Sequence, residues 1–327
     1  MKWLLILIAL LAFLSPHTGW AHEVRPAYLD LSEGPPGEFS VLWKTPMAGE
    51  MRLALDPAFS GPAEILPPAA ARRTGDAAVQ TWRLRADSLR GQTLRINGLE
   101  TTLTDVLVRV AFSDGSTWVG RLTPQQPNAV IPTRPTAWSV AGMYIGLGVE
   151  HILAGVDHLV FVLALLLLTT GNWQLVKTVT AFTVAHSITL GLATLGVVHV
   201  PPKPVEALIA LSIVFVAAEI LSAREGKAGL APRMPWIVAF TFGLLHGLGF
   251  AGALSEVGLP EGQISVALLF FNLGVEAGQL LFIAGVLALV TAVKRIRVAW
   301  PPWAEMMPPY AIGTVAMFWV IQRVAAF

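Results

Sequence analysis

The sequence contains no cysteine, and only 13% of its 327 residues are charged. The missing cysteines exclude disulfides, thiolate zinc sites, iron–sulfur clusters and thiol catalysis. Soluble domains are about 25% charged, whereas this chain has half that charge and is 54% hydrophobic. Its net charge of +1 gives no attraction toward polyanions. A single soluble domain, a disordered chain and a nucleic-acid-binding protein are all disfavoured.

The little charge that is present is concentrated in the first part of the chain. Residues 22–135 carry 24 charged side chains in 114 positions, and residues 136–327 carry 18 in 192. This shift predicts a polar domain followed by a membrane domain.

The N-terminal 21 residues have the pattern of an export signal. Lys2 precedes the apolar stretch Trp3–Leu14, and Gly19 and Ala21 suit a cleavage site. Residues 22–123 then show short alternating segments separated by glycine, proline and aspartate, which predict an exported all-β, sandwich-like domain of about seven strands. Prolines in residues 124–137 predict a stiff linker.

The remaining residues, 138–327, predict an all-α membrane bundle of about six transmembrane helices. Each apolar segment is long enough to cross about 30 Å of hydrocarbon. The predicted spans lie near 142–169, 175–198, 204–223, 235–257, 264–293 and 305–325.

Basic residues between these segments predict the orientation. An exported N-terminal domain places the first span's start outside, and seven basic residues then fall in cytoplasmic positions against one outside. The seven are Lys177, Arg224, Lys227, Arg233, Lys294, Arg295 and Arg297, and the external one is Lys203. We therefore expect a bacterial inner-membrane protein with its N-terminal domain and C-terminus on the periplasmic side.

Ionisable side chains inside the predicted spans are the candidate functional residues, because such groups are costly in a bilayer. They are Glu150, Asp157, Glu219, Glu276, His151, His158, His186 and His246. We expect no lysine or arginine deep in any span, so a cation from outside would pair with these groups. The alternative is that the carboxyl groups are protonated and only hydrogen-bonded.

The first span contains a tandem repeat, Gly148-Val-Glu-His151 and Gly155-Val-Asp-His158. On a straight helix the two histidines lie about 20° apart around the axis and about 10.5 Å apart along it. That separation is too large for one ion bound through bonds of about 2 Å. The spacing therefore predicts a two-step ladder, a half-site completed by other spans, or a helix break at Gly155.

Other spans offer further polar groups at helical spacing. His186 follows Thr183 by three residues, and His246 lies within the GxxxG pattern Gly243–Gly247. GxxxG alone mostly indicates close helix packing. The fifth span carries a polar stripe of Asn272, Glu276 and Gln279.

Imidazole and carboxylate ligands without thiolate fit Ni²⁺, Co²⁺, Zn²⁺ or Fe²⁺ better than Cu⁺, Mg²⁺ or Ca²⁺. A further ligand is expected at His22, which becomes the first residue if cleavage follows Ala21. It would then offer both its α-amine and its imidazole to a metal. A frayed terminus is the alternative.

The motifs together resemble the HupE/UreJ family, specifically the branch with an exported N-terminal domain. The similarity covers nearly the whole chain and rests on His151-x-x-x-Gly155-x-Asp157-His158, Phe182-Thr-Val-Ala-His186-Ser, Gly243-Leu-Leu-His246-Gly-Leu-Gly-Phe250, Phe271-Asn-Leu-Gly-Val-Glu276-x-Gly-Gln279 and His22-Glu-Val-Arg-Pro-Ala-Tyr28. The resemblance implies a nickel or cobalt permease connected with hydrogenase or urease maturation. Hydrogenase-linked members usually carry proline after the first histidine, where this chain has Ile152.

The leading hypothesis is thus a secondary transporter that is not an enzyme. Its partners would be the lipid bilayer, the transported metal and proteins of metal delivery or metalloenzyme maturation, and it would hold no permanent cofactor. The alternatives are a membrane-anchored accessory or sensor protein, a haem redox protein and an intramembrane metalloenzyme. The sequence has no HExxH motif and no ATP-binding motif.

Overall fold

The computed structural model describes residues 26–48, 51–66, 70–74, 77–133, 137–227, 229–257, 264–295 and 302–327. The predicted signal segment, its cleavage site and His22 lie outside these residues. The chain divides into two compact units, one containing the N-terminal sheets and the other containing most of the helices. We call them the β domain and the helical domain and describe each by itself.

The β domain is built on a large mixed sheet, whose strands follow the order β10-β9-β1-β2-β7-β5, with β3 pairing to β2 and β6 to β7. Strand β1 pairs in parallel with β9 and antiparallel with β2. The longer strands alternate apolar and polar side chains, as expected for a half-buried sheet. Their bounds are Ala27–Glu33 (β1), Glu38–Ala48 (β2), Met51–Arg52 (β3), Glu64–Ile65 (β5), Arg72–Thr74 (β6), Ala77–Arg85 (β7), Val106–Ala111 (β9) and Thr117–Leu122 (β10).

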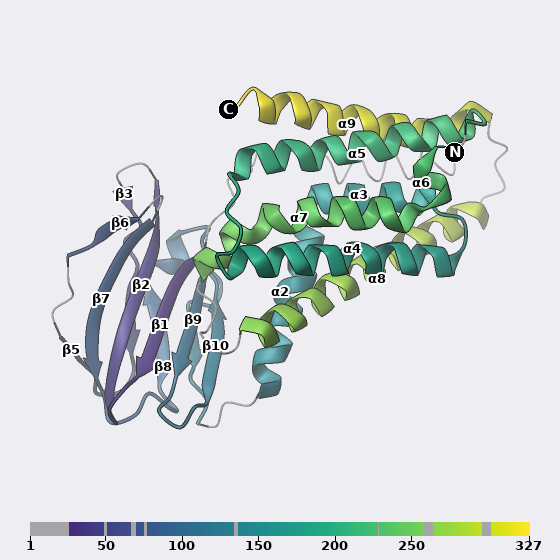
Figure 1. Ribbon diagram of the computed structural model, residues 1–327. Helices are drawn as coiled ribbons and strands as arrows, with labels where there is room; N and C mark the ends of the chain where they lie inside the picture. Colours follow the sequence, from purple (N-terminus) through teal and green to yellow (C-terminus); the bar gives the residue numbers. More distant parts are fainter. Residues whose placement is uncertain are drawn as a thin grey trace. The chain divides into compact units, whose positions relative to one another are not determined.

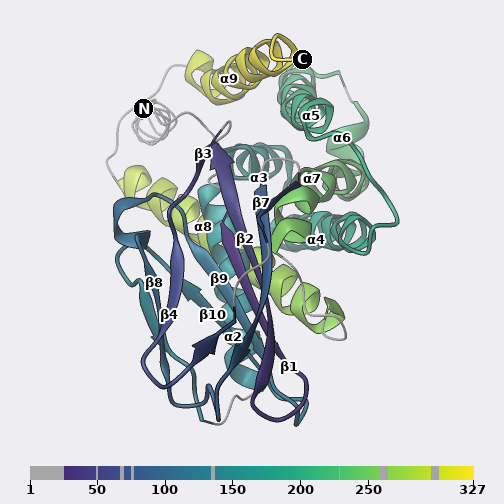
Figure 2. The same ribbon diagram turned by 90° about the vertical axis from the view of Figure 1, so that its left-hand side faces the viewer.

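A second, three-stranded sheet lies in another layer of this domain (Figure 2). It contains β4 (Asp56–Phe59), β8 (Thr93–Asn97) and β11 (Asn128–Val130), and the short helix η1 (Leu99–Thr101) follows β8. Both sheets contribute to one apolar core, which includes Phe39 and Trp43 from β2 and Leu94 and Ile96 from β8. The expected N-terminal β-rich region is therefore present.

The β domain differs from the prediction at two places. Alternation in the sequence predicts a strand over residues 52–55, but β3 ends at Arg52. Leu55 instead enters the core, where its carbonyl accepts a hydrogen bond from Trp43 Nε1 at 3.3 Å. The domain also extends beyond residue 123 into the expected linker. There β11 pairs with β8 and Ile131 is fully buried, so side-chain burial outweighs the stiffness that the surrounding prolines suggest.

The helical domain consists mainly of long apolar helices (Figure 1). Helices α5 and α9 pack side by side along their lengths. The bounds are Ala137–Ala154 (α2), Val156–Leu168 (α3), Asn172–Thr194 (α4), Pro202–Arg224 (α5), Leu230–Arg233 (α6), Pro235–Val257 (α7), Ile264–Arg295 (α8), Pro302–Glu305 (η2) and Met307–Val324 (α9).

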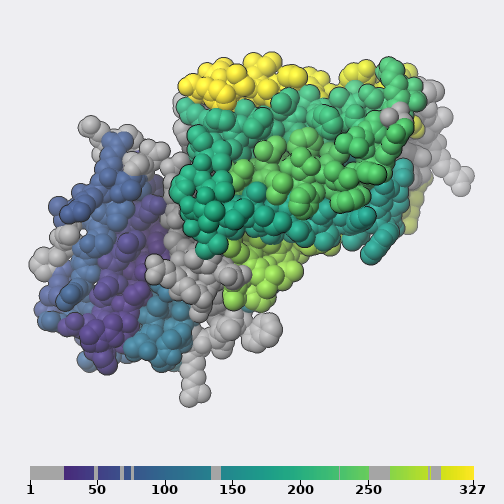
Figure 3. All heavy atoms as spheres, in the orientation of Figure 1, coloured from purple at the N-terminus to yellow at the C-terminus, as the bar shows by residue number. Residues whose placement is uncertain are grey.

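Three of the described helices, α4, α5 and α8, are long and apolar enough to cross a membrane. The bent pair α2 and α3 counts as a fourth span if it is taken as one segment, and α7 has a shorter apolar stretch, Pro235–Gly249. Leucines such as Leu269, Leu273 and Leu281 are exposed on α8. On the face shown in Figure 3, side chains of α4, α5 and α7 form a continuous surface. These apolar helices indicate a membrane protein with three or four candidate spans among the described residues, and the six-span count stays a prediction.

Glycines bring two pairs of helices into close contact. A Cβ on Gly148 of α2 would collide with the carbonyl oxygen of Phe271 in α8, and a Cβ on Gly274 would collide with the backbone of Ile145. Likewise, a Cβ on Gly243 of α7 would lie 2.6 Å from the carbonyl oxygen of Phe182 in α4. Small residues of this kind allow helix backbones to approach closely within a membrane. Here they bring α2 close to α8 and α4 close to α7, and these four helices carry His151, Asn272, His186 and His246.

Candidate metal centre

The first predicted span is bent by 77° at Gly155. The last hydrogen bond of α2 runs from Gly155 N to the carbonyl of His151, and the first of α3 from Leu159 N to the carbonyl of Gly155, both at 3.0 Å. Gly155 itself has an extended conformation, with φ −76° and ψ 91°. The straight-helix interpretation, with its ladder of two separated steps, is therefore wrong. The helix breaks at Gly155, and a histidine of another helix lies beside the two of this span, as the two other possibilities predict.

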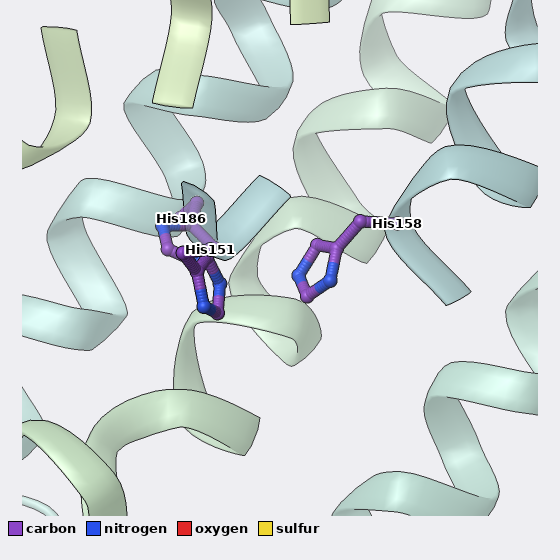
Figure 4. Close-up of side chains that lie close together, drawn as sticks. All are labelled: His151, His158 and His186. Carbon is purple, nitrogen blue, oxygen red and sulfur yellow. The ribbon is translucent and has the colours of Figure 1, made fainter. Parts of the chain in front are cut away.

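The bend brings three histidines from three helices together. His151 of α2, His158 of α3 and His186 of α4 each offer a ring nitrogen, and these nitrogen atoms all lie within 4.8 Å of one another. The ring centroids of His151 and His158 are 4.9 Å apart. In Figure 4 the His151 and His186 side chains overlap in the view, with His158 to their right, and the centroid of the His186 ring lies 6.0 Å from that of His151. We call these three residues the histidine cluster.

His246 of α7 extends the cluster on the far side of His158. Its ring centroid lies 4.9 Å from that of His158, and its Nε2 lies 3.4 Å from Ser212 Oγ of α5. Phe161 and Phe182 pack against the His246 ring. His158 thus contacts His151 on one side and His246 on the other, inside an apolar surrounding.

Several of these imidazoles keep a buried nitrogen that has no hydrogen-bond partner among the described residues. The atoms are His158 Nε2, His186 Nε2 and His246 Nδ1. An unpaired buried polar atom costs about 1–3 kcal/mol, and buried polar groups are nearly always paired in native proteins. Histidines with a purely structural role would therefore be expected to find partners. The arrangement instead leaves lone pairs or N–H groups available to a ligand.

The polar stripe of α8 faces α4, as three hydrogen bonds show. Asn272 Oδ1 lies 3.2 Å from His186 Nδ1, and the Asn272 amide donates to the carbonyl of Leu268 at 2.8 Å. Thr180 donates to Glu276 Oε1 at 2.6 Å, and Thr183 donates to Gln279 Oε1 at 3.0 Å. Because Asn272 accepts from His186 Nδ1–H, the other nitrogen of that ring, Nε2, is the one left to bind a metal.

Two predicted carboxylate ligands are engaged or placed elsewhere. Glu150 is exposed and is absent from the group of nitrogen atoms that converge. Glu219 accepts a hydrogen bond from the backbone N–H of Ala231 at 2.9 Å, at the start of α6. A carboxylate in this position stabilises the amino end of a helix. Neither glutamate belongs to the group of converging side chains among the described residues, and their participation in a metal site stays a prediction.

The third carboxylate, Asp157, is paired with a cation from the protein. Arg323 Nη2 lies 2.6 Å from Asp157 Oδ2. The expectation that no lysine or arginine would compensate the buried carboxylates is therefore wrong for this residue. Arg323 is the functional candidate that sequence reasoning missed. A single arginine in the last apolar segment was the available signal, since such residues in spans usually have a specific partner.

The hydrogen bond between Asn272 and His186 leads to a prediction. Replacing Asn272 by alanine removes the group that fixes the orientation and tautomer of His186. Loss of a residue that hydrogen-bonds to a metal ligand weakens metal binding by about 10–100-fold. We expect a loss near tenfold in Ni²⁺ affinity, measured by calorimetry on the purified protein. The matched control is Asn172→Ala, because Asn172 is exposed at the start of α4. Equal affinities in both variants would contradict the assignment.

A comparison with known protein families finds one family that matches the part of the chain containing these histidines. The profile of the HupE / UreJ protein family matches residues 125–323. The chain belongs to the HupE / UreJ family. This match confirms the resemblance drawn from the motifs, and the histidine cluster, His246, the α8 stripe and Arg323 all lie within it. Searches of curated proteins and of solved structures found no match.

Proposed function

We propose that this HupE / UreJ family protein is a secondary transporter for a divalent transition metal, with nickel and cobalt as the first candidates. The observation that carries the proposal is the histidine cluster, in which three imidazoles from three apolar helices converge. Two of them, His158 and His186, keep a buried Nε2 that has no hydrogen-bond partner among the described residues. The family is associated with nickel and cobalt transport or with an accessory role, which agrees with this chemistry.

The geometry suits a transported ion better than a permanent one. Nitrogen ligands with bonds of about 2 Å to a tetrahedral ion lie about 3.4 Å apart, whereas the nitrogen atoms of the cluster extend to 4.8 Å. Rotations of the rings that shorten these separations by about 1 Å would complete a three-nitrogen site. A site that must close around its ion and open again is what transport requires, since binding must also allow release.

His158 provides the link for movement of the ion. It contacts His151 on one side and His246 on the other, at 4.9 Å between ring centroids in both cases. We propose that the ion passes from the set of His151, His158 and His186 to a set that includes His158 and His246. Sharing one ligand between successive sites avoids a fully unliganded ion inside the apolar domain, which would be very costly.

The remaining part of the proposal concerns the membrane. We propose that six helices span the inner membrane, with the β domain and the C-terminus on the periplasmic side, because the basic residues between the helices are distributed asymmetrically. The β domain would receive the metal from the periplasm. In this proposal His22 is an external ligand, and maturation proteins of metalloenzymes receive the ion in the cytoplasm.

The haem alternative agrees less well with the structure. Two axial imidazoles of a haem lie on opposite faces of the macrocycle, whereas His151 and His158 contact each other edge to face. In the accessory or sensor alternative the exported domain acts and the membrane helices only anchor it, so the buried histidines would be dispensable and no ion would cross the membrane.

Flux measurements separate these possibilities. The full-length protein would be reconstituted in liposomes that contain a metal-sensitive dye, and Ni²⁺, Co²⁺, Zn²⁺ and Mg²⁺ would be added outside. Transport predicts saturable entry of Ni²⁺ or Co²⁺ and no entry of Mg²⁺, which prefers an all-oxygen site. Stoichiometric Ni²⁺ binding without entry of any ion would overturn the transport proposal and favour the accessory role.

A further inference from the structure

Arg323 connects three helices near the bend of the first span. From the last turns of α9 its Nη2 lies 2.6 Å from Asp157 Oδ2 in α3, and its Nη1 donates to the carbonyl of Glu206 in α5 at 2.8 Å. The Arg323 and Asp157 side chains are 23% and 21% exposed. This is a partly buried, geometrically specific ion pair, and removing one partner of such a pair is more harmful than losing a surface contact.

The pair acts directly on the orientation of His158. Asp157 is the second residue of α3 and immediately precedes His158. Consecutive side chains on a helix point about 100° apart, so a helix that turns Asp157 toward Arg323 turns His158 in one fixed direction. In the structure that direction is toward His151, His186 and His246.

The bend needs a restraint from outside its own backbone. The break at Gly155 has no proline, and Ile152 occupies the position after the first histidine. Glycine allows many backbone conformations, so the local sequence alone does not define the bend angle. Arg323 is itself held, because the same end of α9 is joined to α5 by a hydrogen bond from Lys203 Nζ to the carbonyl of Ala326 at 2.8 Å.

We propose that Arg323 is a positioning residue of the histidine cluster. It holds the start of α3 through Asp157, so that His158 faces His151 and His186, and Asp157 serves as the partner of Arg323 rather than as a metal ligand. This inference rests on the proposed function, because it names what places the ligands of that site.

The two possible roles of Asp157 predict opposite effects of Arg323→Gln on Ni²⁺ affinity in the full-length protein. If Arg323 positions the cluster, affinity falls about tenfold, and Arg323→Lys, which retains the charge, recovers most of it. If Asp157 is a ligand, removing the competing guanidinium leaves affinity unchanged or increases it. An unchanged or increased affinity would overturn the proposal.

The double variant Asp157→Asn, Arg323→Gln gives a second test that leaves no unpaired buried charge. Positioning predicts that its affinity is no lower than that of Asp157→Asn alone and is closer to wild type than the summed single losses, because the two residues act as one unit. Losses that simply add would contradict the proposal. If Arg323→Gln alone does not fold, the comparison with Asp157→Asn remains, and an affinity of the double variant below that of Asp157→Asn would contradict the proposal.

A structural measurement separates this inference from the proposed function. The chain has no cysteine, so nitroxide labels can be attached at Gly146→Cys in α2 and Thr170→Cys just after α3, both exposed positions. We expect Arg323→Gln to shift or broaden the distance between the labels, and the control Arg233→Gln, at an exposed residue of α6, to leave it unchanged. An unchanged distance in Arg323→Gln would overturn the positioning role. A wild-type protein that binds no Ni²⁺ would overturn the proposed function, while the label distances would still decide whether Arg323 holds the bend.

Discussion

Replacing His158 by alanine is expected to abolish metal transport and to weaken Ni²⁺ binding by at least about 100-fold. His158 is the one ring of the cluster that contacts both His151 and His246, so its loss removes a ligand from both proposed sites. Loss of a residue that only hydrogen-bonds to a metal ligand lowers affinity by about 10–100-fold, and loss of the ligand itself should lower it further. Calorimetric titration and dye-loaded liposomes would measure the two effects.

The His158→Ala substitution should change the stability of the metal-free protein much less than its affinity for Ni²⁺. His158 Nε2 is buried and has no hydrogen-bond partner among the described residues, so the alanine variant loses ring packing but also removes an unpaired polar atom. We therefore expect little change in the unfolding temperature of the metal-free protein. The matched control is His199→Ala, since His199 is exposed after α4. Wild-type uptake by His158→Ala at limiting metal would reject the cluster as the transport site.

The sequence could predict the candidate metal-site residues of the helical domain, because ionisable groups are rare inside membranes. His151, His158, His186 and His246 are found together, and Asn272 bonds to His186. Their distances could not be predicted from periodicity, which assumes a straight helix. Whether Gly155 breaks the helix or only allows close packing depends on contacts far away in the sequence.

The partners of the carboxylates could not be predicted from the sequence either. The partner of Asp157 lies 166 residues further along the chain, in α9, and the partner of Glu219 is a backbone N–H in the next helix. Neither pairing leaves a local pattern. A residue's type indicated that it needed a partner, but only the packing of α9 and α6 against α3 and α5 determined which one it found.

In the β domain, the alternation of apolar and polar residues indicated where the main strands lie, because one face of each strand is buried. It did not predict the order of the strands. The parallel pairing of β1 with β9 joins residues about 80 positions apart, such as Asp30 and Arg109, which form an ion pair at 2.8 Å. Short strands such as β3 and β11 also lack a sequence pattern of their own, because they depend on the longer strands beside them.

Replacing Gly155 by alanine should weaken Ni²⁺ binding about as strongly as the loss of His158 itself, on the order of 100-fold. A Cβ at this position would lie 2.6 Å from His158 Nδ1 and 3.0 Å from the carbonyl oxygen of His151. Real Cβ atoms essentially never come closer than 3.0 Å to another heavy atom, so the His158 imidazole must shift from its position in the cluster. The backbone conformation of Gly155 has negative φ, which alanine can adopt, and the chain should therefore still fold.

A second effect of the same substitution acts in the same direction. Alanine favours the interior of a helix over glycine by about 1 kcal/mol, so it shifts the bent span toward a continuous helix, in which His151 and His158 would be about 10.5 Å apart. The control is Gly146→Ala in α2, where a Cβ meets no atom within 4 Å and only the helix preference changes. Calorimetric titration with Ni²⁺ and circular dichroism on both variants should show a folded protein in each case and impaired binding only in Gly155→Ala. Wild-type affinity in Gly155→Ala would mean that neither the bend nor the observed position of His158 is needed to bind the metal.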